Sequence, residues 1–172
     1  MPRNVEIKAR VDDVDALRRR AEALSDTPVE VLHQSDTFYV VPDGRLKLRV
    51  LGPERCELIH YQRSDSADAK ASDYALVRSD DPETFERILA AALPIRGVVA
   101  KMRRLYLVGP TRIHLDEVEG LGAFMELEVV LDEGETVDEG IAIAERLMVD
   151  LGLEDAERIA GAYIDLLEKE VR

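Results

Sequence analysis

Residues 3–11 read Arg-Asn-Val-Glu-Ile-Lys-Ala-Arg-Val, and along this stretch apolar and polar side chains alternate with a period of two. Because side chains two apart share one face of a β-strand, Val5 and Ile7 are expected on one face and Glu6 and Lys8 on the other. The stretch therefore predicts a strand that has one apolar face and one charged face.

Further segments of the chain combine short length, alternation and flanking turn residues, as strands do. They lie near residues 29–41, 45–52, 55–63, 72–78, 97–108, 111–118 and 123–132. Helical periodicity instead predicts helices at about residues 12–24, 81–93, 136–151 and 154–169. No repeat or linker divides the chain, so a single domain over residues 1–172 is expected. Many strands with few helices predict an α+β fold, with an antiparallel sheet or barrel and helices packed outside it.

The composition is that of an ordinary folded protein, because 46% of the 172 residues are apolar and 34% are charged. The net charge of −13 argues against a general nucleic-acid-binding role, which needs a basic face. The single cysteine, Cys56, excludes an internal disulfide and a zinc site built on cysteines. The chain has no apolar run as long as a membrane span and no apolar stretch at its start, so we expect a cytoplasmic protein that does not bind membranes.

Charged side chains are distributed unevenly among the predicted strands. Glu126 and Glu128 share a face of one strand, whereas Lys47 and Arg49 share a face of another. One interpretation is an antiparallel sheet whose polar face lies in water. The other is a closed sheet in which acidic and cationic faces meet across a lumen, with a metal bound on the acidic side and anionic oxygens on the basic side. Solvated faces usually mix charges with Ser, Thr and Gln, so the segregation favours the second interpretation.

Several motifs also resemble a known family. Residues 4–8, Asn-Val-Glu-Ile-Lys, resemble the Glu-x-Glu-x-Lys signature of the CYTH superfamily, also called triphosphate tunnel metalloenzymes. Later segments agree with that family in order and spacing, at residues 33–39, 45–49, 58–63, 101–103, 114–122 and 124–128. The chain is most similar to the class IV adenylyl cyclase branch, above all in the Lys-x-Arg strand and the Gly-Leu-Gly-x-Phe-x-Glu-x-Glu run. The resemblance covers nearly the whole chain.

The resemblance implies a closed antiparallel tunnel of eight strands, Mg²⁺ or Mn²⁺ as cofactor, and a triphosphate substrate. A class IV cyclase would convert ATP to cyclic AMP and pyrophosphate. The superfamily also contains triphosphatases, so hydrolysis of inorganic tripolyphosphate or thiamine triphosphate is the alternative. A third hypothesis is a nucleotide- or polyphosphate-binding protein without turnover. The class IV branch further implies a homodimer.

Carboxylate oxygens are the ligands that hard divalent cations prefer, and Arg and Lys side chains bind phosphate oxygens. The predicted metal ligands are Glu6, Asp116, Glu126 and Glu128. The predicted triphosphate-binding residues are Lys8, Lys47, Arg49, Arg63, Lys101 and Arg103, with Arg10, Arg112 and His114 as weaker candidates. Lys8 is also the candidate general base, if neighbouring cations lower its pKa.

Position 4 departs from the family signature, because Asn4 stands where the signature has Glu. An amide can still offer a neutral oxygen to a metal, but one formal negative charge is lost from the acidic wall. We therefore expect weaker binding at a second metal position, which leaves the number of metals open.

Overall fold

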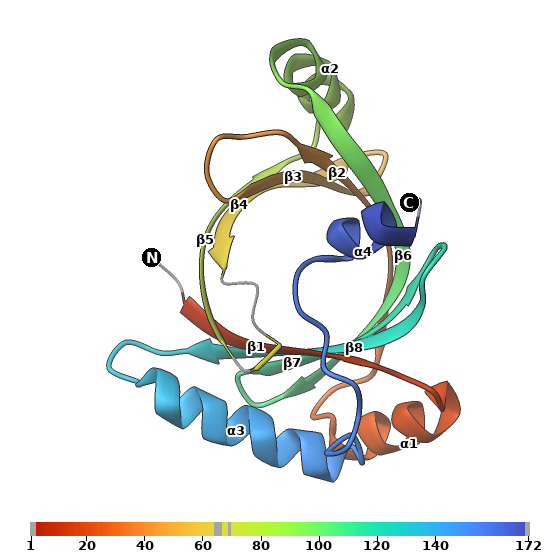
Figure 1. Cartoon of the computed structure of the whole chain (residues 1–172), viewed down its shortest axis with the longest axis vertical. Coiled ribbons are helices and arrows are strands. Elements are labelled where there is room, and N and C mark those ends of the chain that lie inside the picture. Colours follow the sequence, from red (N-terminus) through yellow and green to blue (C-terminus); the bar gives the residue numbers. More distant parts are fainter. Residues whose placement is uncertain (1–2, 64–66, 69, 171–172) are drawn as a thin grey trace.

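The strands of the computed structural model form one closed antiparallel barrel (Figure 1). The structure describes residues 3–63, 67–68 and 70–170, with the backbone alone at residues 63 and 70–72. The strands are β1 (Arg3–Arg10), β2 (Glu30–Tyr39), β3 (Arg45–Gly52), β4 (Arg55–Arg63), β5 (Lys70–Ser79), β6 (Ile95–Val108), β7 (Thr111–Val118) and β8 (Gly122–Leu131). The helices are α1 (Val14–Leu24), α2 (Pro82–Ala92), α3 (Val137–Asp150) and α4 (Tyr163–Glu170). Around the barrel the strands follow the order β1-β5-β4-β3-β2-β6-β7-β8, which confirms the predicted fold class.

The opening stretch, β1, closes the barrel. It pairs with β8 along its whole length and with β5 only over residues 3–6. Its two faces separate as the alternation predicts: Val5 and Ile7 are buried in the apolar core, whereas Glu6 and Lys8 line the interior cavity. Register places Glu6 beside Glu128 of β8, so residues distant in sequence become neighbours on one wall.

The main apolar core lies outside the barrel, between the outer faces of β1, β7 and β8 and the helices α1 and α3. α3 approaches the wall closely at Gly140, where an added Cβ would lie 2.7 Å from Leu131 and 2.8 Å from Val5. Each large apolar side chain fully buried in such a layer contributes roughly 1.5–3 kcal/mol to stability. Because this outer layer supplies the apolar burial, the barrel interior is left available for charged side chains.

The starts of the first two helices agree with the sequence signals. The Asp13 carboxylate accepts a hydrogen bond from the Ala16 amide at the start of α1, and Asp81 does the same for Thr84 at the start of α2, where Pro82 occupies the first turn. These caps satisfy backbone N–H groups that have no partner within the helix.

The predicted helix at residues 154–169 is wrong in its first half. α4 begins only at Tyr163, and residues 154–162 have no helical structure. The amide of Arg10 donates to the carbonyl of Glu157, and the amide of Ile159 donates to the carbonyl of Lys8, both at 2.9 Å. β5 pairs with β1 only over residues 3–6. Residues 157–159 therefore form hydrogen bonds with the part of β1 that β5 does not reach. Helical periodicity in the sequence carries no information about such a distant partner.

The segment after α3 crosses the ring of strands, and α4 lies at its opening beside β6 (Figure 1). α4 packs closely on β6 at Gly97, where a Cβ would lie 2.6 Å from the Ile164 side chain. Tyr163 and Ile164 are buried there together with Phe38 and Phe124. Across the described residues, no helix combines the length and the apolar character needed to cross a membrane.

Candidate active site in the barrel tunnel

A cavity of about 330 Å³ lies inside the barrel. Its lining includes most of the residues that the sequence predicts for the site: Glu6, Lys8, Lys47, Arg49, Lys101, Arg103, Glu126 and Glu128. Arg112 and His114, the weaker candidates, also line it, whereas Arg10 lies outside and pairs with Glu157. The side chain of Arg63 lies outside the described residues.

The charged faces of the strands are not solvated. Lys8, Lys101 and Arg103 retain 5–7% of their accessible surface, and Asp116 retains none. Lysine, arginine and aspartate are almost never buried to this extent unless they are paired. The half-solvated sheet is therefore excluded, and the interior lumen is confirmed.

The first cluster of charges joins β6 and β7. Arg103 donates through Nε and Nη2 to the two carboxylate oxygens of Asp116, each at 2.6 Å. Lys101 Nζ and the Tyr163 hydroxyl also donate to Asp116 Oδ2, at 3.1 and 3.0 Å. Burial raises the pKa of Asp116, but the charges of Arg103 and Lys101 outweigh it and hold that pKa below its usual range. Asp116 is thus already occupied by three side chains, and these contacts favour a role in orienting Arg103 and Lys101; the metal-ligand role stays a prediction.

A second cluster repeats this arrangement on β2 and β3. Arg49 donates through Nε and Nη2 to the two oxygens of Asp36, each at 2.8 Å, and Lys47 Nζ donates to Asp36 Oδ2 at 2.9 Å. In both clusters a Lys-x-Arg pair on one strand is held by an aspartate directly opposite the arginine on the next strand. We call these two groups the Lys-x-Arg clamps.

Sequence reasoning missed Asp36, although a signal for it existed. The turn at Pro42-Asp43-Gly44 joins β2 to β3, and counting outward from that turn places Asp36 opposite Arg49, as the register shows. A buried arginine needs a counter-ion, so a carboxylate at that position was the expected partner.

The acidic wall is formed by β1 and β8. Glu126 lies 3.1 Å from Lys8 Nζ and accepts from Arg103 Nη2 at 2.9 Å. Glu128 accepts from Arg112 Nε at 2.8 Å and from the side-chain amide of Asn4. Burial raises the pKa of both glutamates, but the neighbouring positive groups lower it by a larger amount. The net pKa lies below the usual range, so both carboxylates are ionised.

His114 lies between these two glutamates, 3.9 Å from each. Its pKa is lowered by burial and by the charge of Arg103, which favours the neutral imidazole. In its neutral form it would add a polar group without a formal charge to the acidic wall.

The acidic wall fits a divalent cation by the chemistry of its donors. Glu6, Glu126 and Glu128 offer carboxylate oxygens to the cavity. The side-chain oxygen of Asn4 is buried without a hydrogen-bond partner among the described residues, so the amide that replaces the signature glutamate has an oxygen available. In the described part of the chain no three acidic, His or Cys side chains are gathered as a metal centre. If Glu126 and Glu128 held a metal, they would exchange part of their contacts with Lys8, Arg103 and Arg112.

Two lysines of the clamps have lowered pKa values. Burial and the charge of Arg103 lower the pKa of Lys101 to about 7. Burial and the charge of Arg49 lower the pKa of Lys47 to about 8, although Asp36 opposes the shift. Additional negative charge in the cavity would stabilise the charged ammonium form of both lysines.

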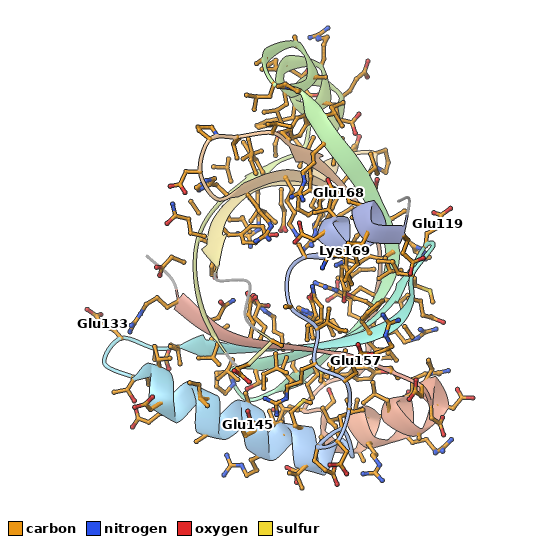
Figure 2. The ribbon with its side chains drawn as sticks, viewed as in Figure 1. Glu119, Glu133, Glu145, Glu157, Glu168 and Lys169 are labelled. Atoms are coloured by element: carbon orange, nitrogen blue, oxygen red, sulfur yellow. The ribbon has the colours of Figure 1, made fainter. Side chains whose placement is uncertain are left out.

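The first turn of α4 closes one end of the cavity. Lys8 Nζ donates to the carbonyl of Gly161 at 3.1 Å and lies 4.0 Å from the centre of the Tyr163 ring. Asp165 fixes the helix by accepting from Arg45 at 2.8 Å and from Arg96 at 2.6 Å. Arg96 also pairs with Glu168, labelled in Figure 2 on the last turns of α4. Tyr163 had no local signal in the sequence, because residues 154–162, which lead to it, were predicted to be helical.

The opposite end of the cavity is lined by leucines together with charged side chains, among them Glu30, Arg55 and Arg78. Leu32 and Leu105 lie six residues along β2 and β6 from Phe38 and Val99, which pack against α4. That separation corresponds to about 20 Å along a strand. Leu51 and Leu76 also face the cavity from β3 and β5. The tunnel thus has a charged middle, an end closed by α4 and an end with several leucines.

Comparison with known proteins agrees with this geometry. The model of the CYTH domain matches residues 2–163. The chain belongs to the CYTH domain family. It is therefore a triphosphate tunnel protein of a family that binds triphosphates and generally uses divalent metals.

Individual relatives are distant in sequence. The chain is 25% identical to adenylate cyclase CyaB of Aeromonas hydrophila over 186 residues, covering 96% of this chain and 88% of the relative. The PH1012 protein of Pyrococcus horikoshii superposes with a TM-score of 0.79 at 24% identity, covering 95% of this chain and 98% of that one. A Hippeastrum protein described as an adenylyl cyclase with a dominant triphosphatase activity superposes with a TM-score of 0.68 at 14% identity, covering 99% and 96%. The structural likenesses establish the fold.

Proposed function

We propose that this protein is a Mg²⁺- or Mn²⁺-dependent enzyme that converts ATP to cyclic AMP and pyrophosphate. The observation that carries the proposal is that the pair of Lys-x-Arg clamps and the acidic wall line one cavity inside the barrel. The distant homology to adenylate cyclase CyaB supports the cyclase reaction over other triphosphate chemistry.

The clamps would bind the phosphates. Arg49 and Arg103 offer planar sets of N–H donors, and Lys47 and Lys101 offer compact positive charges on adjacent strands. The acidic wall, through Glu6, Glu126 and Glu128, would hold the metal. When bound, the metal neutralises charge on the phosphate oxygens. Phosphoryl transfer needs alignment and charge neutralisation more than covalent help from the protein, and this set of residues would supply both.

The two ends of the tunnel suggest the orientation of ATP. The end closed by Lys8 and Tyr163 suits the polar phosphates, and the leucines at the other end suit the nucleoside. The ribose 3′ hydroxyl oxygen would attack the α-phosphorus in the middle of the tunnel and pass its proton to water, while the bond from the α-phosphorus to the bridging oxygen would break and pyrophosphate would leave on the clamps. Lys8 contacts the Glu126 carboxylate and the Gly161 carbonyl, and these contacts of its amine support phosphate binding; its role as general base stays a prediction.

A triphosphatase that acts on tripolyphosphate or thiamine triphosphate is the second candidate. The observation that favours it is the leucine-lined end, because leucine side chains give apolar contact without selecting adenine over another ring. The Hippeastrum protein carries the name of an adenylyl cyclase but is described with a dominant triphosphatase activity, which supports testing hydrolysis in this tunnel as well. The difference between the two is whether a ribose oxygen or a water is aligned with phosphorus.

Product analysis separates the candidates. The pure protein is incubated with ATP or tripolyphosphate and Mg²⁺ or Mn²⁺, and a Glu126→Gln variant serves as the control. Cyclic AMP with pyrophosphate supports the cyclase, orthophosphate supports the triphosphatase, and tight binding without products supports a binding protein. If neither ATP nor tripolyphosphate raises the melting temperature, the tunnel is not a triphosphate site. The homodimer stays a prediction that light scattering tests.

A further inference from the structure

We propose that Asp36 is a positioning residue, which keeps Lys47 charged and Arg49 correctly oriented before a triphosphate enters the tunnel. This inference rests on the proposed function, since it assigns Asp36 to the phosphate-binding clamp of β2 and β3. Asp36 itself would touch neither the substrate nor the metal.

The geometry shows that Asp36 acts on the clamp. Only 2% of its surface is exposed, and both of its oxygens accept hydrogen bonds from Lys47 or Arg49 at 2.8–2.9 Å. Because the carboxylate holds the Nε and Nη2 edge of Arg49, the guanidinium plane is fixed and its remaining N–H groups point away from Asp36. A guanidinium fixed in this way loses less conformational entropy when it binds a phosphate.

The charges around Lys47 explain why a carboxylate is needed there. Arg49 on its own strand and Arg103 on β6 both oppose its positive charge, and Asp36 on β2 is the group that supports it. The rings of Phe38 and Tyr61 lie 5.6 and 5.7 Å from Lys47 Nζ and provide further but weaker support. Without Asp36, burial and two guanidinium groups would act on a lysine whose pKa is already about 8.

Neutral Lys47 would be a poor phosphate ligand. With a pKa of about 8, Lys47 is about nine-tenths charged at pH 7, and each unit of further decrease moves the balance tenfold toward the neutral amine. A variant without the Asp36 charge would then need to take up a proton on Lys47 when it binds a triphosphate. A loss of packing alone would not produce this proton uptake.

Calorimetry measures that proton directly. Binding of tripolyphosphate at pH 7 without metal is titrated in buffers of different ionisation enthalpy, for the wild type, Asp36→Asn and the matched control Glu57→Gln. Glu57 faces the same cavity from β4, opposite Arg49, and its carboxylate pairs with Arg78. We expect Asp36→Asn to take up more protons than the wild type, by at most one, and Glu57→Gln to match the wild type. Equal proton uptake in Asp36→Asn and the wild type would overturn the proposal.

A second measurement separates this inference from the proposed function. Titration of the Lys47 side chain by NMR in the free protein, with ¹³C-labelled lysine, should show a lower pKa in Asp36→Asn than in the wild type. An unchanged Lys47 pKa would refute the role of Asp36, even if tripolyphosphate binds. If the Lys47 pKa is lower in Asp36→Asn but the wild type binds no triphosphate, the role of Asp36 stands and the proposed function is refuted.

The single variant leaves two buried cations without their counter-ion and could fail to fold. The double variant Asp36→Asn/Lys47→Met removes one positive charge together with the carboxylate, so it restores the balance of charge. Because it has no amine at position 47, it should bind with the proton uptake of the wild type. Extra proton uptake in the double variant would assign the proton to another group and overturn the proposal.

Discussion

Replacing Asp116 with asparagine tests whether this carboxylate supports the cation clamp of β6 and β7. The variant keeps one acceptor oxygen but removes the charge that faces Lys101 and Arg103, whose side chains are only 2% and 6% exposed. Removing one partner of a buried ion pair costs about 3–5 kcal/mol, and the retained oxygen favours the lower end of that range. For a chain of this length, a loss of about 3 kcal/mol corresponds to a decrease in melting temperature of roughly 6–12 °C.

The assay is thermal denaturation of Asp116→Asn at pH 7, with Glu117→Gln as the control. Glu117 is the next residue of β7, but its ion pair with Arg104 lies at the surface and should contribute less than about 1 kcal/mol. Because folding lowers the pKa of Asp116, its contribution is fully present above the ordinary carboxyl pKa and is lost as the pH falls further. The difference between wild type and variant should therefore shrink below about pH 4. A variant as stable as the wild type that binds Mn²⁺ more weakly would instead show that Asp116 is a metal ligand.

Three further predictions concern the metal and the pH. Glu126→Gln should abolish metal-dependent turnover, since it removes a carboxylate from the acidic wall, and full activity would remove Glu126 from the site. Asn4→Glu should raise Mn²⁺ affinity, measured by electron paramagnetic resonance, because it restores a negative charge; unchanged affinity would place position 4 away from the metal. Metal-free tripolyphosphate binding should weaken as the pH rises from 7 to 9, since Lys101 and Lys47 lose protons near pH 7 and 8 in the free protein. Calorimetry at constant ionic strength would detect this change, and a flat profile would show that neither lysine binds phosphate.

The strand faces could be predicted from the sequence because they depend on a period of two within each strand. Alternation in residues 3–11 separated Val5 and Ile7 from Glu6 and Lys8 without any knowledge of the neighbours. Closure of the barrel, unlike the strand faces, could not be predicted from periodicity within single strands. It depends on β1 pairing with both β5 and β8, which local periodicity does not encode. The segregation of charges favoured a closed sheet, and the family resemblance supplied the eight-stranded barrel.

Partners across strands were the part of the site that periodicity could not supply. Lys47 and Arg49 were predicted from their own strand, but Asp36 becomes their counter-ion only through the register of β2 and β3. Tyr163 was missed for a related reason. Backbone hydrogen bonds from residues 157–159 to β1 replace the expected helix and bring α4 to the end of the cavity. In both cases the decisive contacts join segments that are distant in the sequence.

The ion pairs of the tunnel also determine how it would bind a polyanion. Burying a charge is costly unless it is paired, and in this structure Asp36, Asp116 and Glu126 supply the partners for the buried cations. A triphosphate brings its own negative charges, so its binding exchanges carboxylate partners for phosphate oxygens instead of creating ion pairs from solvated groups. Its affinity is then the difference between two paired states. Asp116→Asn should therefore lose stability mainly in the free protein, and saturating tripolyphosphate should raise its melting temperature by more than it raises that of the wild type. An equal rise in both proteins would mean that the phosphates bind without contacting the clamp of Lys101 and Arg103.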